Sequence, residues 1–127
     1  MPHAKILLID DEKELLELIG EQLAIAGYEV ITAENGEDGI IKARMLNPDL
    51  VICDMHMPKK DGFAVLRELK NNNFTAPFIM LTVEDKFDKI KKAYDEEADF
   101  YITKPVELEK LLKNIKILLN ISKNKER

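Results

Sequence analysis

The sequence lacks most of the residues that mark secreted, membrane-spanning or thiolate-metal proteins. It has one cysteine and no tryptophan, so it holds neither an intramolecular disulfide nor a site built from several thiolates. No apolar run is close to the length of about 20 residues that a membrane-spanning helix needs. The first apolar run, Ile6 to Ile9, is followed at once by acidic residues, unlike a secretory signal. We therefore expect a cytoplasmic protein that does not associate with membranes.

The charge balance is acidic and also narrows the function. Acidic residues number 24 against 19 basic ones, giving a net charge of −5, which argues against nucleic-acid binding by this chain alone. At 127 residues with 46% hydrophobic content, the chain has the size of one globular domain. We expect that domain to cover residues 1–122, followed by a polar tail at 123–127 and no effector domain.

Short apolar runs alternate along the chain with longer segments of helical periodicity. Three runs are continuously apolar, as in parallel strands covered on both faces, and two are mixed, as in edge strands. The expected strands are 6–9, 28–32, 50–53, 78–81 and 100–103, and the expected helices are 15–26, 36–46, 63–70, 84–97 and 106–122.

This alternation predicts an α/β fold with a doubly wound, five-stranded parallel sheet. Right-handed crossovers place successive helices on the two faces of such a sheet. The order 2-1-3-4-5 puts both mixed strands at the edges, which is the flavodoxin-like (βα)5 arrangement. Ligands of such sheets bind at the carboxyl ends of the strands.

Chemically distinctive side chains follow four of the predicted strands. Strand one ends in Asp10 and Asp11, strand three in Asp54, strand four in Thr82 and strand five in Lys104. These residues should gather at one end of a parallel sheet. Three close carboxylates repel one another unless a cation is present, and Mg²⁺ prefers oxygen ligands. A carboxylate, Mg²⁺, a lysine and a hydroxyl suit phosphoryl transfer onto the carboxylate, with Asp54 as acceptor.

Each of these residues also has an ordinary structural interpretation. Asp11 is a candidate N-cap of the first helix, with Glu14 completing a capping box. Thr82 fits a strand end, Lys104 a solvated surface and Asp54 the start of a turn. All four interpretations would have to coincide at one end of one sheet, which favours a shared site.

The motifs at these positions resemble the receiver domain of two-component response regulators. The resemblance covers the chain from about Lys5 to Leu119 and is carried by "ILLIDDE", "DMHMPKKDG", "LTVED" and "ADFYITKP". It implies that Asp54 accepts a phosphoryl group from a histidine kinase or a small phosphodonor. It also implies that Asp10, Asp11, Asp54 and the main-chain carbonyl of His56 hold Mg²⁺, that Lys104 contacts the phosphoryl group, and that the bond to the following proline is cis.

The resemblance further implies a conformational switch formed by Thr82 and Tyr101. The hydroxyl would move toward the phosphoryl group and the aromatic ring would turn inward, changing the surface of helix four, strand five and helix five, residues 84–119. This surface would bind a downstream effector that the sequence does not identify. A homodimer through the same surface is left open, and Tyr101 is equally compatible with an ordinary edge-strand position.

Three further residues are candidates for setting reaction rates. Val83 stands where the family usually has a smaller residue, so it should narrow access to Asp54. His56 and Glu84 flank the expected path of the hydrolytic water, although a solvent-facing loop role explains them equally well. Cys53 is expected to be a small core residue.

Two other functions compete with the switch. One is an interaction domain that is never phosphorylated. The presence of the acidic residues, Thr82 and Lys104 together argues against it, because binding alone does not require them. The other is a Mg²⁺-dependent phosphohydrolase of the haloacid-dehalogenase type. Its nucleophile follows strand one in a D-x-D pattern, whereas this chain has Asp10, Asp11 and Glu12 there and no inserted cap domain.

Overall fold

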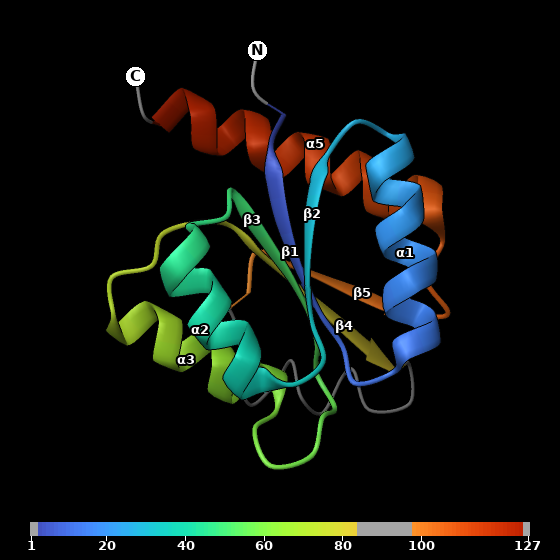
Figure 1. The fold of residues 1–127 in the computed structure, drawn as a ribbon. Coiled ribbons are helices and arrows are strands. Elements are labelled where there is room, and N and C mark those ends of the chain that lie inside the picture. The colour runs from blue at the N-terminus through green and yellow to red at the C-terminus, as the bar shows by residue number, and fades with distance from the viewer. Residues whose placement is uncertain (1–2, 84–97, 126–127) are drawn as a thin grey trace.

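The computed structural model describes residues 3–83 and 98–125, which form a parallel sheet with helices on both faces (Figure 1). The sheet has five strands in the order β2-β1-β3-β4-β5, and every neighbouring pair is parallel. This is the order expected from the sequence. The strands are β1 (Lys5–Ile9), β2 (Glu29–Ala33), β3 (Leu50–Asp54), β4 (Phe78–Val83) and β5 (Phe100–Lys104), and the helices are α1 (Lys13–Ile25), α2 (Gly36–Leu46), α3 (Gly62–Asn71) and α5 (Leu108–Lys125).

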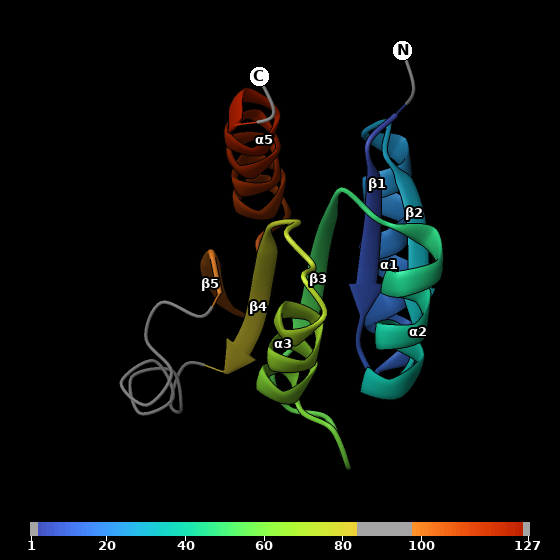
Figure 2. The same ribbon diagram turned by 90° about the vertical axis from the view of Figure 1, so that its left-hand side faces the viewer.

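Each face of the sheet has its own hydrophobic core because side chains alternate along a strand. Helices α1 and α5 cover one face, where Leu23 and Ile115 pack on strand residues such as Ile52. Helices α2 and α3 cover the other, where Ala43 and Leu66 pack with their own set of strand residues. Figure 2 is viewed from the side of α2 and α3, which lie in front of the sheet. Burial on both faces explains why β1, β3 and β4 are continuously apolar.

The helix boundaries differ slightly from those expected from periodicity. Helix α5 continues to Lys125, into the stretch expected to be a polar tail, because polarity alone does not stop a helix. Helix α1 begins after Glu12, and its N-cap makes no side-chain hydrogen bond. The interpretation of Asp11 as the helix cap is therefore wrong. The helix expected at 84–97 lies outside the described residues.

The loop between β3 and α3 is held close to the carboxyl end of the sheet. The backbone N–H of Gly62 donates to the Met55 carbonyl at 2.9 Å, which closes the loop at its base. A Cβ atom on Gly62 would lie 2.7 Å from the Asp54 carbonyl oxygen and 2.5 Å from Met80 Sδ. Only glycine lets α3 begin this near to the residue that ends β3.

Within the parts of the chain that the structure describes, no helix is both long and apolar enough to span a bilayer.

Candidate functional site

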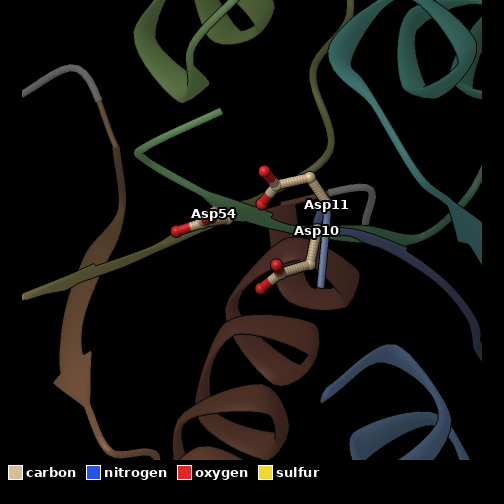
Figure 3. A group of neighbouring side chains, drawn as sticks. All are labelled: Asp10, Asp11 and Asp54. Carbon is tan, nitrogen blue, oxygen red and sulfur yellow. The ribbon is translucent and has the colours of Figure 1, made fainter. Parts of the chain in front are cut away.

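Three carboxylates meet where β1 and β3 end (Figure 3). One oxygen of each of Asp10, Asp11 and Asp54 lies within 4.8 Å of the others. Asp10 and Asp54 are almost completely buried, with 1% and 4% of their surface exposed, whereas Asp11 is exposed. The strands β1 and β3 are direct neighbours, so parallel pairing brings residues 44 positions apart to one edge.

Lys104 provides the positive charge among these carboxylates. Its Nζ lies 3.2 Å from Asp10 Oδ2 and 3.2 Å from Asp54 Oδ1. Glu12 Oε1 lies 3.6 Å from the same nitrogen, at the more exposed rim of the site. The lysine stands at the end of the edge strand β5 and reaches across β4 to these groups, as its long side chain allows. The peptide bond between Lys104 and Pro105 is cis.

The electrostatics of the site favour protonation of its buried acids. Burial, together with the nearby Asp10 charge, raises the pKa of Asp54 to about 6. Burial likewise raises the pKa of Asp10, against the opposing effects of the Glu12 backbone N–H and the Lys104 ammonium. Burial alone would lower the pKa of Lys104, but the attraction of Asp54 and Asp10 outweighs it and the pKa is raised. One lysine therefore leaves the two buried carboxylates incompletely neutralised.

The backbone of His56 lies beside Asp54. Its side chain is exposed, and its N–H donates to Asp54 Oδ1 at 3.4 Å. Met57, the next residue, is buried in the core between the sheet and α2 and α3. This anchor holds the backbone around residue 56 at the edge of the acidic group.

Thr82 lies at the end of β4, but its hydroxyl is bonded away from the acids. The side chain is fully buried, and the hydroxyl donates to Met55 Sδ at 3.2 Å and to the Val83 carbonyl at 3.4 Å. Val83 itself is half-buried. Of the two residues expected to flank the site as rate-setting groups, His56 is described above and Glu84 lies outside the described residues.

Tyr101 packs on the face of the sheet that α3 covers. Its ring centroid lies 6.3 Å from that of Phe63, with the ring planes inclined by 42°. The ring is half-buried against the same core that contains Met55 and Met57. Cys53 is buried as a free thiol whose pKa is raised well above the usual value by burial, which agrees with the expected core role.

Two residues with direct contacts to the site were missed by the sequence reasoning. Glu12 approaches Lys104, and its backbone N–H donates to Asp10 Oδ1 at 2.9 Å. Met55 accepts a hydrogen bond from Thr82. Met55 was detectable, because alternation along a strand puts the residue after Asp54 on the opposite face, where Thr82 also lies.

The donor set fits a hard divalent cation. Mg²⁺ prefers oxygen ligands, and the carboxylates of Asp10, Asp11 and Asp54 supply only oxygen. Burial raises the pKa values of Asp10 and Asp54, and a bound cation would favour their ionised forms. Asp11, being exposed, leaves the group open to solvent and so to a partly hydrated ion.

Sequence comparison assigns these features to one family. The model of the response regulator receiver domain matches residues 6–116. The chain is 38% identical over 121 residues to the alkaline phosphatase synthesis transcriptional regulatory protein PhoP of Bacillus subtilis, covering 94% of this chain and 50% of the relative. It is 38% identical over 117 residues to the DNA-binding dual master transcriptional regulator RpaA of Synechocystis, covering 91% of this chain and 48% of that protein. The chain thus spans about half the length of these curated relatives.

Solved structures agree with this assignment. The chemotaxis protein CheY4 of Vibrio cholerae superposes with a TM-score of 0.81 at 31% identity, covering 91% of this chain and 98% of its own. A response regulator receiver domain protein of Clostridium thermocellum gives a TM-score of 0.79 at 38% identity, covering 97% and 96%. With the family match extending over most of its length, this chain belongs to the response regulator receiver domains of two-component systems.

Proposed function

We propose that Asp54 accepts a phosphoryl group and that this modification changes the surface around β5 and α5. The observation that carries the proposal is the placement of Asp54. This buried carboxylate shares the Lys104 ammonium with Asp10 and lies beside a second, exposed acid. Receiver domains are signalling domains, so we expect no substrate turnover beyond the domain's own phosphorylation and dephosphorylation.

The chemistry that we propose is an in-line displacement at phosphorus. An Asp54 carboxylate oxygen forms the new bond to phosphorus as the bond to the leaving group breaks, and the leaving group departs with that electron pair. Lys104 holds an oxygen of the transferring group. Asp10, Asp11, Asp54 and the His56 carbonyl would hold Mg²⁺, which supplies charge neutralisation when bound.

Phosphorylation would act by shifting the balance between two conformations. The Thr82 hydroxyl would leave its present partners for the phosphoryl group, and Tyr101 would follow. The reporting surface, residues 84–119, is described from residue 98 onward as β5 and α5. We propose a histidine kinase or small phosphodonor as the source and a downstream effector as the partner, in the cytoplasm; a homodimer through this surface remains a hypothesis.

PhoP and RpaA, the two relatives described above, are both named as transcriptional regulators, and RpaA is also named as DNA-binding. Because this chain covers about half of each, control of transcription is a proposal for the output and not a property of this domain. The acidic net charge of −5 favours an output through protein contacts rather than direct DNA binding by this chain.

Intact-mass spectrometry after incubation with acetyl phosphate and Mg²⁺ tests the proposal. We expect a Mg²⁺-dependent gain of one phosphoryl group that Asp54→Asn abolishes. Asp11→Asn is the matched control, since it removes a carboxylate of the same group but keeps the acceptor; it should slow the gain and raise the Mg²⁺ requirement. No gain in the wild-type protein, together with no binding of BeF₃⁻, would contradict the proposal and favour an interaction domain that is never phosphorylated.

A further inference from the structure

The buried hydroxyl of Thr82 has a specific partner that the family resemblance did not indicate. The side chain is 0% exposed, and a buried hydroxyl without a partner is costly. Its shorter hydrogen bond goes to the thioether of Met55, at 3.2 Å, and a longer one goes to the Val83 carbonyl at 3.4 Å. Among the described residues, the Met55 thioether and the Val83 carbonyl accept from this hydroxyl, and neither belongs to the acidic group.

The sheet geometry holds Met55 in this position. Asp54 pairs with Leu81 in the register of β3 and β4, so the following residues, Met55 and Thr82, also lie opposite each other. Because side chains alternate, Met55 stands on the face away from the Asp54 carboxylate. Its N–H donates to the Leu81 carbonyl at 2.8 Å, and its carbonyl accepts from Gly62 at 2.9 Å. The backbone that carries the thioether is therefore fixed on both sides.

We propose that Met55 is a positioning residue that holds the Thr82 hydroxyl in the unphosphorylated conformation and so sets the balance of the switch. This inference rests on the proposed function, because it concerns the hydroxyl that would move to the phosphoryl group. Met55 also belongs to the core against which Tyr101 packs. It therefore bonds one of the two switch residues, Thr82, and helps to form the core that supports the other.

A thioether suits this role because it is a weak acceptor. It satisfies the buried hydroxyl in one state, yet the bond is easily exchanged for a stronger one to an anionic phosphoryl oxygen. A methionine side chain is also flexible and refills space after the hydroxyl has left. A leucine at this position would keep most of the volume but would leave the hydroxyl with only the longer bond to the Val83 carbonyl.

The first test measures the affinity for BeF₃⁻ at saturating Mg²⁺, followed by ¹⁹F nuclear magnetic resonance. Met55→Leu should destabilise the resting conformation and tighten binding by about two- to five-fold, the effect of losing one weak hydrogen bond. Met80→Leu is the matched control, since it makes the same substitution in the same core at a residue that does not accept the Thr82 hydrogen bond. In a Thr82→Val background, Met55→Leu should change nothing.

Equal effects of Met55→Leu and Met80→Leu, or a Met55→Leu effect that persists with Thr82→Val, would overturn the inference. A second measurement needs no phosphoryl mimic and separates this inference from the proposed function. In urea unfolding, Met55→Leu should lower the transition midpoint more in the wild-type background than with Thr82→Val. Additive shifts would refute the contact even if Asp54 is phosphorylated, whereas coupled shifts without BeF₃⁻ binding would support the contact and refute the switch.

Discussion

Lys104 Nζ lies 3.2 Å from Asp54 Oδ1, yet the pKa of that carboxyl is still raised to about 6. Burial disfavours the ionised form of Asp54, and the neighbouring Asp10 charge adds to that effect. The lysine is shared with Asp10, also at 3.2 Å, so it does not fully compensate either acid. Two negative charges are thus held near one positive charge, and this imbalance makes the site responsive to protons and cations.

The stability of the metal-free protein should depend on the charge of Asp54. Its pKa is higher in the folded state than the value near 3.9 of an unfolded chain, so the folded state binds the proton more tightly. The resulting stabilisation is fully present below pH 3.9 and is lost as the pH rises through about 6. In EDTA, Asp54→Asn should therefore stabilise the protein above pH 7 by about 2 kcal/mol and have much less effect at pH 4. Urea unfolding of both proteins across this range measures the difference; a constant difference would contradict the assignment.

A divalent cation should stabilise the protein through the acidic group. An Mg²⁺ ion that bound the folded carboxylates and not the unfolded chain would add about 2.7 kcal/mol of stability at one hundred times its dissociation constant. Thermal unfolding in a Mg²⁺ titration checks this. Asp10→Asn and Asp54→Asn should each reduce the shift, whereas Asp49→Asn, an exposed acid at the other end of β3, should leave it intact.

The close approach of α3 to the end of β3 should make Gly62 intolerant of a side chain. Gly62→Ala would place a Cβ atom 2.7 Å from the Asp54 carbonyl oxygen, which is backbone and cannot move aside alone. We expect a loss of about 1–3 kcal/mol in the free energy of unfolding. Gly20→Ala is the control, since its nearest neighbour is Val30 Cγ1 at 3.7 Å. Because alanine favours a helix more than glycine does, Gly20→Ala should raise the free energy of unfolding by about 0.5–1 kcal/mol. Equal effects at the two positions would argue against the close packing at Gly62.

The bulk of Val83 should slow exchange at Asp54. The residue follows Thr82 at the end of β4 and is half-buried. We propose that its side chain borders the route to the Asp54 carboxylate, so Val83→Ala would widen that route by two methyl groups. We expect faster phosphorylation by acetyl phosphate and faster loss of the phosphoryl group. Time-resolved intact-mass measurements give both rates, with Val30→Ala on the edge strand as a control. Unchanged rates would show that access is limited elsewhere.

The sequence by itself determined the architecture and the composition of the site. Continuous apolar runs at β1, β3 and β4 and mixed runs at β2 and β5 indicated the strand order, because burial on one or both sides governs which residues a strand tolerates. The acidic residues and Lys104 were located because the carboxyl ends of parallel strands meet at one edge. No detail of packing was required for either inference.

Only the tertiary structure decided which atoms make contact within that edge. Periodicity gave Asp11 a plausible capping role, but the chain begins α1 after Glu12 and leaves Asp11 with the acidic group. The partner of the Thr82 hydroxyl depends on the register of β3 and β4 and on a rotamer, neither of which a local pattern specifies. The raised pKa of Asp54 likewise depends on how deeply the fold buries this carboxyl and on how close it brings Asp10 and Lys104. These residues are distant in the sequence, so no local pattern specifies the effect.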